Sequence, residues 1–111
     1  NLYVDETSSL KMNENKNCAL LSQGRKKRTI TIKNGGSLEA KYNGINYQAS
    51  VDEDKYYAQT SALNFGVYGW YENAKKILLY PNLDDVVFEN GAKVTISNNY
   101  TRGISNYGNN T

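Results

Sequence analysis

Thr7-Ser8-Ser9-Leu10 returns in altered form as Thr60-Ser61-Ala62-Leu63, a spacing of 53 residues from Thr7 to Thr60. Self-similarity at a fixed spacing, combined with short stretches of alternating polar and apolar residues, is typical of a repeated β unit. We therefore predict an all-β fold of two related halves, a first repeat at residues 1–57 and a diverged second repeat at 58–111. Later in each half an apolar run and a glycine precede an alternating strand: Leu20–Gly24 before Thr29–Asn34, and Val87–Gly91 before Lys93–Asn98.

The centre of the first half contains the clearest strand and turn signals. In Thr29–Ile32 the isoleucines alternate with threonines, as in a half-buried strand. Asn34-Gly35-Gly36 and Asn43-Gly44 have the chemistry of tight turns, and short strands follow each of them. The pattern predicts a β-meander over residues 29–49, and no segment of the chain has a convincing helical pattern.

Composition limits the function classes. The chain has 111 residues, so each half alone would bury a marginal core and we expect the two halves to pack together. The lack of histidine removes the commonest general base and most zinc sites. A net charge of +2 argues against a dedicated nucleic-acid binder, and no apolar run is long enough to span a membrane. The lone Cys18 cannot form an intrachain disulfide.

The order of these motifs resembles that of the bacterial Src-homology-three-type domain, a small β-barrel of cell-wall hydrolases and other exported bacterial proteins. The resemblance implies a barrel in each half, a cell-wall-targeting role, and a secreted or cell-surface location in a bacterial or phage-encoded protein. The first residue, Asn1 rather than Met, fits a processed or excised chain. The matching motifs are Ser8–Lys11, Ser61–Asn64, Gly24 with Thr29–Ile32, Gly91 with Val94–Ile96, and Tyr42-Asn43-Gly44 with Tyr47.

An aromatic insertion in the second half provides the candidate ligand-binding residues Tyr68, Trp70 and Tyr71. Aromatic rings flanked by glycines can form a platform on which sugar or peptide groups stack. Alternatively, Trp70 fills the core of a small barrel that has few large residues. Three further residues complete the predicted ligand-binding set, namely Tyr42, Tyr47 and Arg102.

The basic run and the two acidic clusters each allow a functional and a structural interpretation. The basic run Arg25–Arg28 suits an anionic polymer or lipid headgroup, or it is a solvated strand edge that discourages aggregation. Asp52-Glu53-Asp54 and Asp84-Asp85 suit a glycosidase or a calcium site, or they are solvated loops. Because neither acidic cluster has the ligand spacing of an EF-hand, and adjacent acids on loops are usually solvated, we predict no catalytic residues, no metal and no cofactor.

The leading hypothesis is a non-catalytic binding module, not an enzyme, that recognises peptidoglycan or another cell-envelope polymer through surface aromatics. The alternative is a phage or pathogen interaction factor that binds and blocks a host protein through an exposed strand edge and tyrosines. The predicted partner is therefore a cell-wall glycan or peptide, or a protein.

Overall fold

The structure is a computed structural model that describes residues 1–22, 26–44, 61–71, 75–80 and 82–107; for 67–71 and 75–80 it describes the backbone alone. The described residues form strands and no helix, so the predicted all-β class is confirmed. The strands are β1 (Leu2–Val4), β2 (Ser9–Lys11), β3 (Leu20–Ser22), β4 (Thr29–Ile32), β5 (Ser37–Lys41), β6 (Leu63–Phe65), β7 (Val67–Tyr71), β8 (Lys75–Tyr80), β9 (Asp85–Phe88), β10 (Lys93–Ser97) and β11 (Ile104–Asn106).

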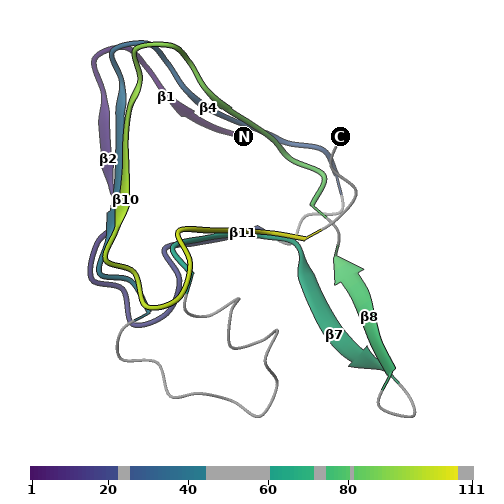
Figure 1. Ribbon diagram of the computed structural model, residues 1–111. Coiled ribbons are helices and arrows are strands. Elements are labelled where there is room, and N and C mark those ends of the chain that lie inside the picture. The colour runs from purple at the N-terminus through teal and green to yellow at the C-terminus, as the bar shows by residue number, and fades with distance from the viewer. Residues whose placement is uncertain (23–25, 45–60, 72–74, 81, 108–111) are drawn as a thin grey trace.

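Three sides of a triangular coil are visible in Figure 1, and each side is a parallel sheet. The sheet orders are β1-β4-β9, β10-β5-β2 and β11-β6-β3. Successive strands of the chain thus belong to different sheets, and a strand pairs with the strand one full turn later. This architecture is a parallel β-helix.

The paired residues divide the chain into three coils. Coil 1 contains β1, β2 and β3; coil 2 contains β4, β5 and β6; coil 3 contains β9, β10 and β11. In coils 1 and 3 the same numbers of residues separate the first strand from the second and the second strand from the third. Leu2 to Leu10 is 8 residues and Leu10 to Leu20 is 10, and the equivalent Val86 to Val94 and Val94 to Ile104 are again 8 and 10.

The expected barrel and meander are not observed among the described residues, because the three sheets of the coil are open and parallel and residues 29–41 contribute to two different sheets. Parallel neighbours require a long connection between them, and here that connection is a complete coil. The predicted equivalence of Leu10 with Leu63 is wrong: Leu10 pairs with Leu38, whereas Leu63 pairs with Leu20 and Ile104. The predicted boundary between residues 57 and 58 falls outside the described residues, and all three parallel sheets combine strands from both sides of it.

The predicted turn at Asn34-Gly35-Gly36 exists, but it directs the chain into the next sheet rather than back along β4. Gly35 has a φ of 88°, and a side chain at this position would begin 2.7 Å from the carbonyl oxygen of Glu6. At Gly36 the corresponding distance to the carbonyl oxygen of Asp5 is 2.5 Å. Glycine therefore lets coil 2 lie directly against coil 1 at this corner.

Alternation in each strand places apolar residues inside the coil. Ile30 and Ile32 of β4 are buried, as are Leu38 and Ala40 of β5, while the residues between them are partly exposed. Burying each large aliphatic side chain contributes about 1.5–3 kcal/mol. The buried core consists of Val4, Ile30, Ile32, Leu38, Ala40, Ala62, Leu63 and Phe65.

A column of asparagines stabilises the corner that follows the second sheet. Asn15, Asn43 and Asn99 occupy the same place in successive coils, and the Oδ1 of each later residue accepts a bond from the amide Nδ2 of the preceding one, at 2.8 and 2.9 Å. The same Oδ1 atoms accept the backbone N–H of Asn15 and Asn43. The residue before each asparagine, Glu14, Tyr42 or Asn98, has φ between 56° and 59°. The ladder satisfies backbone groups that this turn leaves unpaired.

Coil 2 carries extra chain on both sides of β6. Leu38 to Leu63 spans 25 residues where Leu10 to Leu20 spans 10, and Leu63 to Val86 spans 23 where Leu20 to Ile30 spans 10. The second insertion contains the antiparallel hairpin of β7 and β8, which leaves the outline of the coil in Figure 1. The hairpin is thus an addition to a coil that closes without it in coil 1.

We expect Asn43→Ala to lower the free energy of unfolding by about 2–4 kcal/mol, because it leaves several buried groups without partners. Asn43 is fully buried and its Nδ2 also donates to the carbonyl oxygen of Met12. Asn13→Ala is the matched control. Asn13 also makes two side-chain hydrogen bonds but is exposed, so water can replace them and the loss should stay below about 1 kcal/mol. Urea unfolding monitored by circular dichroism would measure both, and equal losses would contradict the structural role of the ladder.

Candidate functional site

The hairpin contains three of the six predicted ligand-binding residues. Tyr68, Trp70 and Tyr71 all lie in β7, where Trp70 pairs with Lys76 and Tyr71 with Lys75 of β8. A bulge between Val67 and Tyr68 shifts the register where β7 begins. Whether Trp70 is core or platform lies outside the described residues. The backbone nevertheless assigns the whole aromatic cluster to one insertion.

Tyr42 and Arg102 lie at the asparagine corner, away from the hairpin in sequence, and Tyr47 lies outside the described residues. The Tyr42 ring is 48% exposed, and Arg102 is also exposed. Tyr42 precedes Asn43, whose carbonyl oxygen accepts the backbone N–H of Tyr100 at 3.0 Å. Tyr42 therefore precedes one of two stacked asparagines, and Tyr100 follows the other in the adjacent coil.

Two exposed tyrosines, Tyr3 and Tyr100, are not part of the predicted ligand-binding set. Tyr100 is 51% exposed, beside Tyr42 and two residues before Arg102. Tyr3 is 62% exposed on β1, with the Lys33 ammonium 5.9 Å from its ring centre. The proximity of Tyr42 and Tyr100 follows from the coil spacing, because Asn43 and Asn99, 56 residues apart, stack in adjacent coils.

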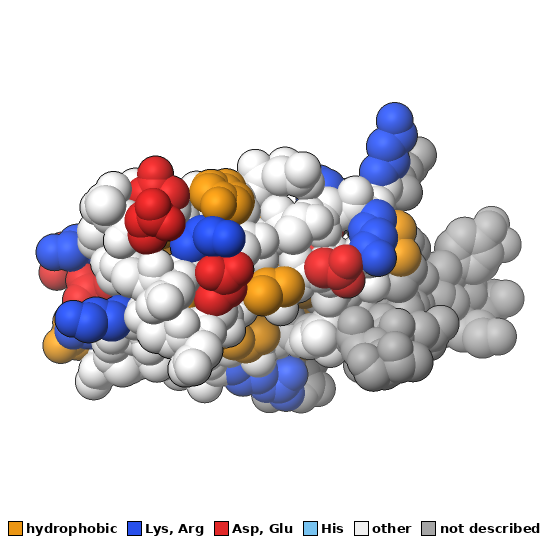
Figure 2. All heavy atoms as spheres, turned by 90° about the horizontal axis from the view of Figure 1, so that it is seen from above, with side chains coloured by type: hydrophobic (Ala, Val, Ile, Leu, Met, Phe, Trp, Pro, Cys, Tyr) orange, Lys and Arg blue, Asp and Glu red, His pale blue; other side chains and the backbone are white. Residues whose placement is uncertain are grey.

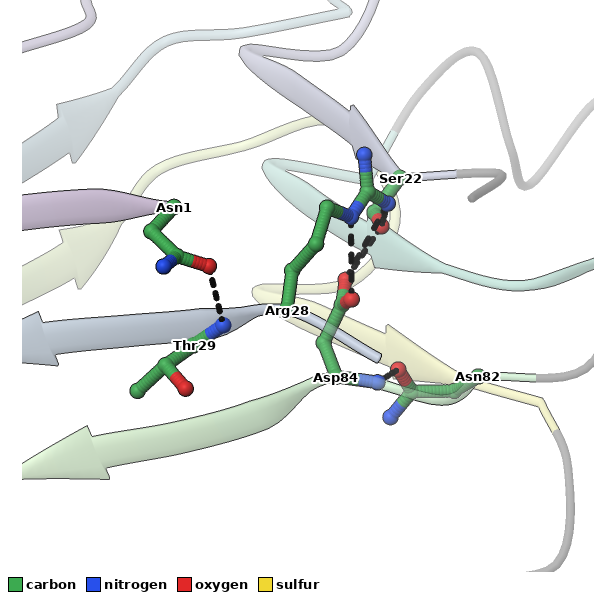
Figure 3. Close-up of polar contacts among 6 residues, drawn as sticks. All are labelled: Asn1, Ser22, Arg28, Thr29, Asn82 and Asp84. Carbon is green, nitrogen blue, oxygen red and sulfur yellow. Dashed lines mark hydrogen bonds and ion pairs between the residues drawn. The ribbon is translucent and has the colours of Figure 1, made fainter. Parts of the chain in front are cut away.

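Two residues of the basic run, Lys27 and Arg28, form ion pairs with the second acidic cluster, as Figure 3 shows for Arg28 and Asp84. Arg28 Nε donates to Asp84 Oδ1 at 3.2 Å, and Ser22 Oγ bonds to both side chains. The neighbouring Lys27 pairs with Asp85 at 3.0 Å. Coil stacking brings residues 28 and 84 together because β4 and β9 pair with a spacing of 56 residues. These ion pairs favour the structural readings of both clusters.

The side chain of Asp84 is fixed by polar contacts with Ser22 and Arg28. Its side chain is 2% exposed, and its backbone N–H donates to Asn82 Oδ1 at 2.8 Å. The other acidic cluster, Asp52-Glu53-Asp54, lies outside the described residues. Among the residues that are described, no group of three or more Cys, Asp or Glu side chains is arranged to hold a metal ion.

Other titratable groups respond to local contacts. The backbone N–H of Asn34 and then the Lys33 ammonium lower the pKa of Glu89, and Glu89 in turn raises the pKa of Lys33. A hydrogen bond from Asn13, followed by one from Lys41, lowers the pKa of Glu39. Burial raises the pKa of the Cys18 thiol, which keeps it protonated and weakly nucleophilic at neutral pH.

Two depressions lie at the corner between the third and first sheets, one at each end of the β-helix. One, of about 220 Å³, is lined mainly by coil 1 residues together with Arg28 and Asp84; the other, of about 590 Å³, is lined mainly by coil 3 residues. On the face in Figure 2, acidic and basic side chains are interspersed with apolar ones. That face offers no broad basic surface for a polyanion.

No family model matches the chain, and no curated protein or solved structure matches it either. The described part of the chain contains no helix of the length and apolarity needed to cross a membrane.

We expect Arg28→Ala to reduce stability by about 2 kcal/mol or more, because the nearly buried side chain of Asp84 would lose its main polar partner. Lys27→Ala should cost less than about 1 kcal/mol, because its partner Asp85 is more than half exposed. Urea denaturation of both variants makes the comparison. Equal, small losses would show that the Arg28 pair is as dispensable as a surface pair.

Proposed function

We propose that this chain is a non-catalytic binding module of an exported or cell-surface protein. Its ligand is peptidoglycan or another cell-envelope polymer, and the aromatic residues of the hairpin make the main contact. The observation that carries the proposal is the position of Tyr68, Trp70 and Tyr71 in an insertion between β6 and β9 that stacking does not require.

The insertions favour recognition at one side of the molecule. In repeat proteins, insertions between repeats occur on one face, and this is often the binding face. Both long insertions of this chain belong to coil 2 and flank β6, whereas coil 1 has 10-residue steps on both sides of β3 and coil 3 has a 10-residue step before β11. A ligand that contacts the hairpin therefore approaches the chain beside the third sheet.

The chemistry of the hairpin suits a polymer of sugars and short peptides. Tyrosine and tryptophan rings offer flat apolar faces for sugar rings and polar groups for hydroxyls. Lys75 and Lys76 lie opposite Tyr71 and Trp70 in the strand register, so the hairpin combines basic and aromatic residue types over a short length. A carboxylate-bearing polymer would find both kinds of contact in one short segment.

A pull-down on purified bacterial cell walls tests this function. We expect the wild-type chain to be retained and a Trp70→Ala, Tyr71→Ala double variant to bind at least tenfold more weakly, since it loses the two largest stacking surfaces. Tyr3→Ala serves as control because its exposed ring lies on β1, in a different sheet. Equal retention of the wild type and the double variant would exclude the hairpin site, and no retention of the wild type would exclude the wall ligand.

A second function, a phage or pathogen factor that blocks a host protein, is favoured by the free edges of the hairpin. In the described residues β7 and β8 form a two-stranded sheet and pair only with each other. Each strand then offers a row of unpaired backbone groups to which an extended segment of a partner can add.

Crosslinking in host lysate followed by mass spectrometry separates the two functions. A single stoichiometric protein partner that is lost when residues 67–80 are replaced by a short turn would support the protein-binding function. Crosslinks spread over many abundant proteins, unchanged by that replacement, would reject it.

A further inference from the structure

The coil 3 end of the β-helix exposes side chains whose equivalents are buried in coil 2, whereas the inward apolar residues of coil 1 are partly buried or, for Val4, buried. In coil 2, Ile32 and Leu63 are 0% and 3% exposed. Their equivalents in coil 3, Phe88 and Ile104, are 38% and 45% exposed, although they occupy the same inward positions. The difference arises because no following coil covers them among the described residues.

The 590 Å³ depression lies where this cover is missing. Phe88, Ile104 and Val86 of coil 3 belong to its lining, together with Phe65 of coil 2 and several polar residues. The 220 Å³ depression occupies the same corner at the opposite end, where Leu2 and Leu20 of coil 1 line it. Terminal repeats in stacked architectures need a polar or covered outer face, whereas apolar side chains of both terminal coils line these depressions.

We propose that the open surface of coil 3 binds the open surface of coil 1 of a second copy, head to tail. Coil 3 and coil 1 have the same 8- and 10-residue steps, so the strands of coil 1 can continue all three parallel sheets in the existing register. This contact extends the coil-to-coil interface that already joins coils 1, 2 and 3.

The inward columns match across the proposed contact. Apolar residues at the end of coil 3 would meet apolar residues at the start of the next coil 1 in five columns, and the sixth column would join two polar residues. Their order is Val86 to Leu2, Phe88 to Val4, Val94 to Leu10, Ile96 to Met12, Ile104 to Leu20, and Asn106 to Ser22. A continuous apolar interior would result, and its burial is the driving force.

The asparagine ladder also has complementary open ends. Each Asn Oδ1 accepts the backbone N–H of the preceding rung, as Asn43 does from Asn15 and Asn99 does from Asn43. In the described structure the backbone N–H of Asn99 has no following rung, and the Oδ1 of Asn15 has no preceding one. Stacking would place Asn15 of the second copy below Asn99 and satisfy both groups.

One outward column opposes the contact. The register places Asp5, Lys33 and Glu89 in successive coils, so Asp5 of the second copy would follow Glu89. Both carboxylates have lowered pKa values, Asp5 through its hydrogen bond from Ser8 and Glu89 through the N–H of Asn34, so both are charged at neutral pH. They lie at the solvent-exposed rim, where water and salt screen the repulsion.

A two-fold contact between two coil 3 surfaces fits less well. It would turn the strands antiparallel and oppose β9, of four residues, to the three-residue β11. The head-to-tail arrangement is heterologous and leaves each assembly with one open end of each kind. A substitution at one end of the β-helix should therefore affect self-association differently in the two arrangements.

Sedimentation velocity over a range of concentrations, on the 111-residue chain, tests the proposal. We expect the wild type to associate, and Ile104→Lys at the coil 3 end or Leu20→Lys at the coil 1 end to weaken self-association at least tenfold. Phe88→Lys and Met12→Lys replace these variants if circular dichroism shows loss of fold. Thr31→Lys, in the outward row of the middle coil, is the matched control and should associate like the wild type.

Mixing the two end variants gives the decisive result. Each variant keeps one intact end, so an equimolar mixture should form heterodimers and stop there. A wild type that remains monomeric at all concentrations would overturn the proposal. So would self-association that persists in Leu20→Lys and is abolished by Ile104→Lys, because that pattern belongs to the two-fold contact.

Discussion

The register between coils is the constraint on which the rest of this structure depends. A parallel strand of three to five residues has little stability alone, and here each one is held by backbone bonds to the coils beside it and by inward side chains stacked in columns. Register errors of one residue would move Ile30 and Ile32 to the surface and Thr31 to the interior. The glycines at the first corner and the asparagines at the second fix this register, since each fits one place in the coil.

Sequence reasoning identified several strands correctly and assigned them the wrong partners. Alternation in Thr29–Ile32 and Lys93–Ile96 is a local signal, so the strands could be predicted. Strand pairing, in contrast, joins residues that are far apart in the sequence. The insertions around β6 increase the spacing between paired residues from 28, for Leu2 and Ile30, to 56, for Ile30 and Val86. The 53-residue spacing that relates Leu10 to Leu63 therefore joins leucines of two different sheets.

A usable signal was nevertheless present in the asparagines. Asn15, Asn43 and Asn99 are separated by 28 and 56 residues, the same spacings that relate Leu10, Leu38 and Val94. In a chain rich in asparagine this agreement is easy to overlook. The same alignment explains the charged clusters, because Arg28 and Asp84 are 56 residues apart and a search for isolated motifs separates them. The aromatic cluster could be located from sequence because insertion length is itself a sequence property, whereas the surroundings of its rings depend on tertiary contacts.

Stacking and ligand binding, if both proposals hold, reinforce each other through geometry. Neighbouring strands in a sheet are about 4.8 Å apart, so three coils advance the β-helix by about 14 Å. A head-to-tail assembly would repeat the β7–β8 hairpin once per copy at that interval along one side, because every copy has the same orientation about the axis apart from the gradual twist of the sheets. A polymer with regularly spaced sugars could then contact several hairpins at once. Weak individual contacts would add through effective concentration, so a small aromatic surface on each copy would suffice for firm attachment.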